Sequence, residues 1–467
     1  MAEKKTAAQK LKEKLFLDRQ NGYYTMTDED IKASSEFAEL YKDFLDKSKT
    51  EREAVSYAVA LLKKKGFKEF RKGKKLKAGD KIYKINRGKA VLISVIGSAP
   101  IAEGVRLCAA HIDSPRLDMK QNPLYEDNEM ALLKTHYYGG IKKYQWTTIP
   151  LSLHGVVIKA DGTSVTVNIG EDDKDPVFCV SDLLPHLAAE QMSRPASKLI
   201  RGEDLNIIVG SRPFSKDKES ESVKLNIMNI LFEKYGITEA DLVSAELEAV
   251  PAFKARDIGF DRSLIGGYGH DDRCCSFPAL MAAVDSSKPV HTSVTVLTDK
   301  EETGSDGNTG LRSSYLRYFI EDIAEALGEQ GRDVLSASEC LSADVNAAFD
   351  PSFPEVNERR NCAYVNKGVC ITKYTGARGK SGTSDASAEF TGRIRRLMDS
   401  KGVLWQTGEL GKVDEGGGGT VAAYIANLDV DTIDMGVPVI SMHAPFEIIS
   451  KIDLYSAYKA FAAFIAD

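Results

Sequence analysis

The chain has 467 residues, of which 43% are hydrophobic and 28% charged, and its formal net charge is −6. This length suggests about two or three domains, or one large α/β domain with an insertion. The composition is that of a globular protein, and its acidic balance gives no reason to expect nucleic acid or a membrane as a partner.

Two features of the sequence bear on its compartment. The N-terminal segment MAEKKTAAQKLKEKLF lacks the apolar core of a signal peptide, and no stretch is long and apolar enough to cross a bilayer. The seven cysteines are an odd number without the spacing of a disulfide framework. Cys274 and Cys275 are adjacent and no CxxC pair exists, so a cysteine zinc site is not predicted. We expect a cytoplasmic protein.

The first part of the chain combines helices with buried strands. Apolar residues at helical spacing predict a helix over residues 55–62, and apolar runs at 90–96 and 105–110 predict strands covered on both faces. Between the expected helix and the first expected strand, residues 63–89 carry thirteen Lys or Arg side chains and only two acidic ones. Because few aromatic residues are interleaved, we interpret this stretch as a solvated face or a subunit contact, not a nucleic-acid site.

The middle of the chain is rich in short β-like runs, such as 151–158 and 164–169, separated by polar turns. We therefore predict an inserted, largely β domain over residues 121–244. It would divide a catalytic domain into two parts, residues 1–120 and 245–467. The strand edges of such an insertion offer pairing surfaces for a dimer.

The last part of the chain alternates helices with strands, which implies a mostly parallel sheet flanked by helices and so an α/β fold. Expected strands lie at 293–298, 403–405, 432–435 and 439–442, and expected helices at 276–284, 312–327 and 454–465.

Histidines and acidic residues follow the ends of the predicted strands. In open α/β sheets, ligands bind just outside the carboxyl ends of strands, so these side chains are expected along one edge. They are His111 and Asp113 after the run at 105–110, Glu301 and Glu302 after 293–298, Asp344 after the segment CLSA, and His443 after PVISM, with the pair Asp271 and Asp272 just before a helix.

Each of these residues has an ordinary explanation on its own, such as a helix N-cap or a satisfied polar side chain. Together, several converging carboxylates would repel strongly without a cation. Two histidines and three carboxylates suit Zn²⁺, with Mn²⁺ or Co²⁺ possible. If one carboxylate bridges, five ligands can hold two ions about 3.5–4 Å apart, the spacing used for hydrolysis. Asp113 is placed to accept the second ring N–H of His111.

Five motifs of the chain resemble, in order, those of the aspartyl and vacuolar aminopeptidases, a family of two-zinc exopeptidases. The motifs are AAHIDSPRLD, GHDDRCCSF, DKEETGSDG, SADVNAAFDP and GVPVISMHAPFE. The resemblance runs from the first helices to the last strand and includes the inserted domain. It implies peptide substrates with a free N-terminus and a homo-oligomer, a closed tetrahedral shell of twelve subunits built from dimers.

The resemblance also implies roles for single residues. Glu301 resembles the general base and Asp113 the residue that orients a histidine ligand, while Asp271 resembles the ligand that bridges both ions. The implied metal ligands are His111, Asp271, Glu302, Asp344 and His443.

Three further residues are expected to contact substrate. The resemblance implies that Lys373 faces the substrate and that the inserted domain sends His154 into a neighbouring subunit's active site. Gly418 lies in the run 416–419, whose free N–H groups can bind a peptide backbone. The chain carries Gly-Lys-Ser at 379–381 where the family often has an aromatic residue. We favour broad or neutral specificity over acidic specificity.

The sequence thus predicts a metal-dependent aminopeptidase in which two zinc ions activate water and Glu301 accepts its proton. A carboxypeptidase or amide deacylase on the same scaffold is one alternative. A non-catalytic shell protein is another, although such a protein has no reason to keep Glu301.

Overall fold

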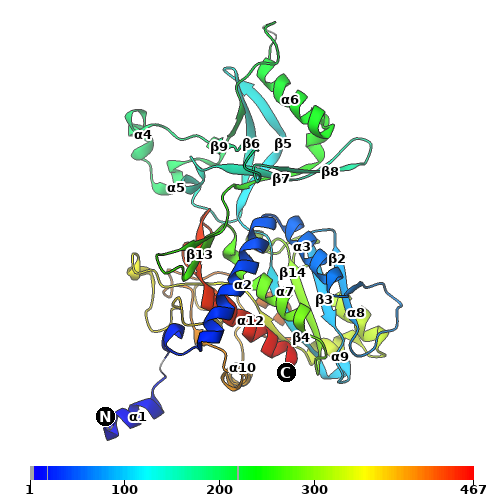
Figure 1. The fold of residues 1–467 in the computed structure, drawn as a ribbon, viewed down its shortest axis with the longest axis vertical. Coiled ribbons are helices and arrows are strands. Elements are labelled where there is room, and N and C mark those ends of the chain that lie inside the picture. Colours follow the sequence, from blue (N-terminus) through cyan, green and yellow to red (C-terminus); the bar gives the residue numbers. More distant parts are fainter. Residues whose placement is uncertain (1–4, 18, 218–219) are drawn as a thin grey trace.

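The computed structural model describes residues 5–17, 19–217 and 220–467. Within these residues the chain forms a nine-stranded sheet with helices on both faces and a separate seven-stranded sheet. Figure 1 shows the second sheet standing at one end of the first, joined to it by the chain segments that enter and leave it.

The central strands of the nine-stranded sheet are parallel, and antiparallel strands flank them. β14, β4, β15 and β19 run parallel to one another. β3 and β2 on one side and β17 on the other are antiparallel to their inner neighbours. The prediction of a mostly parallel sheet therefore holds at the centre. On one flank β2 and β3 form a hairpin, whose short turn permits only antiparallel pairing. The order is β1 (Lys68–Glu69), β2 (Lys81–Asn86), β3 (Ala90–Val95), β14 (Thr292–Thr298), β4 (Val105–His111), β15 (Glu339–Ser342), β19 (Asp431–Gly436), β17 (Val369–Thr372) and β18 (Trp405–Thr407).

Two apolar clusters cover the two faces of this sheet. In β3, Val91 and Ile93 pack into one cluster and Leu92 into the other. Burial on both sides explains why β3 and β4 are continuous apolar runs. One face is covered by α2 (Asp28–Lys47), α3 (Glu51–Lys64), α7 (His270–Asp285), α10 (Ala388–Ser400) and α12 (Lys451–Ala466), and the other by α8 (Tyr315–Ala326), α9 (Gly331–Ser336) and α11 (Ala422–Ala426).

The strand expected at 439–442 is much shorter than predicted. β20 is only Pro438–Val439, and it pairs with β16 (Asn346–Ala347). Ser441 and His443 have φ values of 59° and 65°, which lie outside the extended region. The chain therefore turns at this point and brings His443 to the edge of the sheet. β12 (Arg256–Ile258), β13 (Leu264–Gly267) and β21 (Glu447–Ser450) form a small sheet nearby.

The seven-stranded sheet is antiparallel throughout and forms the second body, here called the antiparallel domain. Its strands run from Arg116 to Pro251, somewhat beyond the predicted limits of 121 and 244. Its own apolar core surrounds the buried Trp146. The order is β8 (Ser164–Ile169), β7 (Leu151–Ile158), β11 (Ala245–Pro251), β5 (Arg116–Asp127), β6 (Met130–Tyr138), β10 (Ile207–Gly210) and β9 (Cys179–Val180), with α4 (Ala189–Met192), α5 (Ala196–Leu199) and α6 (Ser222–Tyr235) beside it.

The N-terminal helix α1 (Ala7–Leu15) extends away from the body and buries none of its residues (Figure 1). In the part of the chain that the structure describes, no helix has the length and apolar character needed to span a membrane.

Candidate metal centre

The five predicted ligands meet at one edge of the nine-stranded sheet. His111 ends β4, and Asp344 follows the neighbouring strand β15. Glu302 lies in a 3₁₀ turn just beyond β14. Asp271 stands in the first turn of α7, and His443 follows β20. The parallel strands therefore carry side chains from distant parts of the sequence to one place, as the topology requires.

Asp271 lies between the two histidines. Its Oδ1 is 3.1 Å from Nε2 of His111, and its Oδ2 is 3.2 Å from Nε2 of His443. Nε2 of His443 is also 3.4 Å from Oε2 of Glu302, and Nε2 of His111 is 3.9 Å from Oδ1 of Asp344. The ligand atoms thus fall into two groups that share the carboxylate of Asp271.

The adjacent glutamates Glu301 and Glu302 face different surroundings. The carboxylate of Glu302 is almost fully buried, with a side chain 2% exposed, and faces His443. The side chain of Glu301 is 18% exposed, and its Oε2 lies 3.9 Å from Nε2 of His111. Glu301 therefore borders open space, whereas Glu302 points into the group of ligands.

Asp113 holds several groups of the site at once. Its backbone carbonyl and its Oδ1 lie 3.1 and 3.3 Å from Nδ1 of His111, which leaves Nε2 facing the other ligands. Its two carboxylate oxygens accept the backbone N–H groups of Glu301 and Glu302, each at 3.2 Å. Such contacts behind a ligand fix its orientation.

Burial and mutual repulsion dominate the electrostatics of this cluster. Burial raises the pKa of Glu301 to about 7, and the charges of Asp113 and Asp271 add to this. Burial, followed by the charge of Asp271, raises the pKa of Glu302 well above its ordinary value. Burial lowers the pKa of His443, but its contact with Asp271 outweighs this and raises it to about 11. The cluster therefore holds more buried negative charge than the protein neutralises.

The residues fit a zinc site by two further observations. The Oε1 atom of Glu302 is buried and has no hydrogen-bond partner among the described residues. Ligand atoms of His111, Asp271 and Glu302 lie within 4.8 Å of one another, as do those of His111, Glu301 and Asp344. An unpartnered carboxylate oxygen beside imidazole nitrogens is the donor set that Zn²⁺ prefers.

Sequence reasoning missed Glu447, which holds two of the ligands through their backbone. Its Oε1 accepts the N–H of His443 at 2.7 Å, and its Oε2 accepts the N–H of Asp271 at 3.1 Å. Glu447 is 1% exposed. Its position four residues after His443, inside a motif already noted, was the available signal.

The vicinal cysteines are not part of the centre. Sγ of Cys275 accepts the N–H of Val437, and burial raises the pKa of Cys274 to about 12. Their sulfur atoms and Asp272 lie within 4.8 Å of one another, but a thiol with a raised pKa is a poor zinc ligand.

A cavity of about 460 Å³ opens onto the ligands. Its wall includes Glu301, Asp344, Thr375 and His443. Gly418 also lines this cavity, where its backbone can meet a bound molecule.

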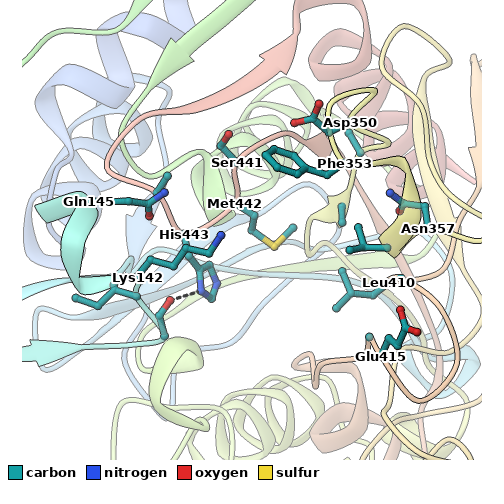
Figure 2. A pocket seen from close by; sticks show the side chains of 18 of the residues that line it. Lys142, Gln145, Asp350, Phe353, Asn357, Leu410, Glu415, Ser441, Met442 and His443 are labelled. Atoms are coloured by element: carbon teal, nitrogen blue, oxygen red, sulfur yellow. Dashed lines mark hydrogen bonds between the residues drawn. The ribbon is translucent and has the colours of Figure 1, made fainter. Parts of the chain in front are cut away.

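A larger cleft of about 810 Å³ adjoins the first and shares His443 and Met442 with it. Figure 2 shows Met442 and His443 side by side, with Phe353 and Leu410 farther along the cleft. The two spaces therefore meet at these shared residues.

Lys373 does not line either space. Its Nζ donates to Oδ1 of Asp385 at 2.7 Å, and Lys380 donates to Oδ2 of the same carboxylate at 2.9 Å. The lysine predicted to face the substrate is thus paired within the chain.

His154 is buried among residues of its own chain. Its ring is 1% exposed, and its Nδ1 lies 2.7 Å from Oε1 of Glu53. Its Nε2 lies 3.0 Å from Ser152 and 3.2 Å from Glu171. Both ring nitrogens thus have partners within the same chain, and the contribution of His154 to a neighbouring subunit's site stays a prediction.

The chain is similar to known zinc peptidases in sequence and in fold. Residues 44–465 match a family model described as Aminopeptidase I zinc metalloprotease (M18). A probable M18 family aminopeptidase 1 from Clostridium acetobutylicum is 50% identical over 459 residues, covering 97% of this chain and 99% of the relative. The crystal structure of an M18 family aminopeptidase from Thermotoga maritima superposes with a TM-score of 0.92 at 43% identity, covering 96% of this chain and 99% of that one. A yeast aminopeptidase 1 dodecamer shares the fold, with a TM-score of 0.74 at 22% identity over 92% of this chain and 96% of that one.

Proposed function

Because the chain belongs to the M18 family of zinc aminopeptidases, we propose that it removes N-terminal residues with two zinc ions bridged by Asp271. The observation that carries this is the position of Asp271, whose two oxygens face His111 and His443 at 3.1 and 3.2 Å. One ion would be held by His111, Asp344 and Asp271, and the other by His443, Glu302 and Asp271. Co²⁺ or Mn²⁺ suits the same ligands.

The chemistry divides between the ions and Glu301. Bound zinc would polarise the scissile carbonyl and lower the pKa of the attacking water. Glu301 is the one carboxylate of the pair with an exposed edge, so it accepts the proton of the water and returns it to the leaving amine. Asp113 positions Glu301 and Glu302 through their backbone N–H groups.

Acidic side chains favour a substrate with a free α-amine. The wall of the metal cavity carries Asp271, Glu301, Glu302 and Asp344. Among the described lining residues of this cavity none is Lys or Arg. With zinc bound, the ions would offset the charge of Asp271, Glu302 and Asp344. Glu301 is then the carboxylate of this wall that attracts a cationic amine, and an acylated amine carries no such charge. This supports an aminopeptidase over a carboxypeptidase or amide deacylase, whose substrates present a carboxylate.

The lining of the same cavity also limits which side chain the first residue of the substrate can have. An Asp or Glu side chain needs a cation to offset its desolvation. Lys373 is committed to Asp385, and the cavity instead offers Thr375, Leu410 and Met442. We therefore assign a neutral first residue, with Leu or Met as the expected type.

The chain would work as a homo-oligomer, as the yeast dodecamer does. Several large apolar side chains of the antiparallel domain are exposed, which is typical of a surface that binds another subunit. They include Val177, Leu183, Leu187, Met192, Phe214 and Phe232. Assembly as a tetrahedral dodecamer and a cytoplasmic location remain predictions.

One experiment tests the function. Purified protein is loaded with zinc, its metal content is measured, and rates are compared for leucine 4-nitroanilide and its N-acetyl derivative. We expect close to two ions per chain and cleavage of the free-amine substrate only, with Glu301→Gln as the inactive control. Full activity with no more than one ion would remove the bridging role of Asp271. Preference for the N-acetyl substrate would favour the deacylase, and binding of zinc without any cleavage would favour the non-catalytic shell protein.

A further inference from the structure

Three consecutive residues of the antiparallel domain contact the metal centre of the other domain. They are Tyr138, which ends β6, and the two glycines that follow it, Gly139 and Gly140. These residues, here called the 138–140 segment, contribute none of the five proposed ligands. Each nevertheless meets a different part of the centre.

Tyr138 contacts the group behind His111. Its hydroxyl donates to Oδ2 of Asp113 at 2.8 Å. Asp113 is 0% exposed, so this bond forms away from solvent, where a donor to a carboxylate is worth more than in water. The guanidinium of Arg116 lies 4.0 Å from the centre of the Tyr138 ring and fixes it from the other side. Arg116 is itself held by Glu51 at 3.1 Å.

The two glycines contact the ligands of the second ion. Gly139 has φ +75°, and a Cβ at this position would lie 3.2 Å from Oε2 of Glu302. The carbonyl of Gly140 accepts from Nδ1 of His443 at 2.8 Å, the bond drawn as a dashed line in Figure 2. With Nδ1 engaged, the ring presents Nε2 to Asp271 and Glu302.

We propose that the 138–140 segment is a positioning element for both metal sites. Tyr138 fixes Asp113 and through it His111, while Gly139 leaves room for the carboxylate of Glu302 and Gly140 sets the ring of His443. The inference rests on the proposed function, because it assumes that these ligands hold zinc. It follows that the placement of the antiparallel domain sets the metal affinity of the catalytic domain.

The first test removes one hydroxyl. Tyr138→Phe keeps the ring against Arg116 and deletes only the donor to Asp113. The control is Tyr137→Phe, a neighbouring tyrosine whose side chain is 38% exposed and points to the other face of the strand. Metal-free protein is titrated with zinc against a chromophoric chelator. We expect Tyr138→Phe to bind zinc about 10–100-fold more weakly, as for other residues that orient a ligand, and Tyr137→Phe to match wild type.

The second test fills the space beside Glu302. Gly139→Ala places a methyl group against the carboxylate and also strains the backbone. Gly162→Ala separates these effects, since Gly162 has φ +82° but nothing within 4 Å of its added Cβ. Both substitutions should lower the midpoint of thermal unfolding of the metal-free protein. Only Gly139→Ala should weaken zinc binding and change the visible absorption spectrum of the cobalt-loaded protein.

The outcomes separate this inference from the function on which it rests. Failure of wild-type protein to bind zinc would overturn both. Zinc binding by wild type with unchanged affinity in Tyr138→Phe and in Gly139→Ala would overturn only the role of the 138–140 segment. If Tyr138→Phe does not fold, the comparison of Gly139→Ala with Gly162→Ala decides the question.

Discussion

The metal centre and the cluster around His154 contain the same types of residue, but they differ in how the charge of their buried carboxylates is matched. Both gather buried histidine and carboxylates. The His154 cluster is made of His154, Glu53, Glu171, Lys49 and Lys254. In it, both carboxylate oxygens of Glu171 face a lysine: Oε1 lies 2.7 Å from Nζ of Lys49, and Oε2 lies 2.6 Å from Nζ of Lys254. In the metal centre, Oε1 of Glu302 has no partner among the described residues.

The pKa values of Glu171 in the His154 cluster and Glu302 in the metal centre shift in opposite directions for this reason. Burial by itself would raise the pKa of Glu171, but His154 and the lysines lower it below its ordinary value. Burial and the charge of Asp271 raise the pKa of Glu302. A buried carboxylate whose charge is matched by cations of its own chain needs no further partner, whereas one without them indicates a cation from outside the chain.

The sharpest test of the metal centre uses its two adjacent glutamates. Glu301→Gln should lower kcat by about 10²–10⁴, the usual contribution of a general base, with zinc content unchanged. Glu302→Gln should lower zinc content, because it removes a ligand atom. Steady-state kinetics and elemental analysis on the same preparations measure both effects. Loss of zinc in Glu301→Gln with retention in Glu302→Gln would reverse the two roles.

A substitution in the His154 cluster should instead lower the free energy of unfolding. His154→Ala leaves Glu53 without its imidazole partner in a largely buried position, at a cost of about 3–5 kcal/mol in the free energy of unfolding. Urea unfolding measures this cost, and zinc titration of the folded protein should give the wild-type affinity.

The same variant decides whether His154 serves a neighbouring subunit. A stable but inactive His154→Ala protein that regains activity when its subunits are mixed with Glu301→Gln subunits would place His154 in a partner's site. Retained activity in the unmixed variant would agree with the interior position described above.

The sequence predicted the central sheet and the edge that carries the site, but not the contacts between residues that lie far apart in the chain. The apolar runs of β3, β4 and β14 predicted the central sheet, and residues directly after strand ends predicted its active edge. The contact of His154 with Glu53 was not predictable, because the two residues lie 101 positions apart and the sequence does not show their pairing. Tyr138 was missed for the same reason, since its hydroxyl matters only through a contact with Asp113.

A smaller effect is expected in how the stability contributed by His154 depends on pH. Burial lowers the pKa of His154, but Glu171 and Glu53 outweigh this and raise it. A raised pKa in the folded protein means that protonated His154 contributes stability fully below about 6.5, the unfolded value, and loses it as pH rises through the folded value. The difference in unfolding free energy between wild type and His154→Gln should therefore shrink as the pH rises above about 6.5. A difference that grows with pH would mean that the ring is neutral in the cluster.

The smallest effect is expected at Lys373, which lies outside both regions and is 42% exposed. Because its charge is already matched by Asp385, Lys373→Ala should change the ratio of kcat/KM for Leu- and Glu-leading peptides by less than about threefold, which is under 1 kcal/mol. Lys380→Ala is the matched control, since Lys380 binds the same carboxylate. A lysine that recognised an acidic side chain would behave differently, because its removal would leave that side chain desolvated and unpaired. If wild type prefers Glu by more than about a hundredfold, about 2.7 kcal/mol, and only Lys373→Ala erases this preference, then Lys373 leaves Asp385 for the substrate and the assignment of a neutral first residue is wrong.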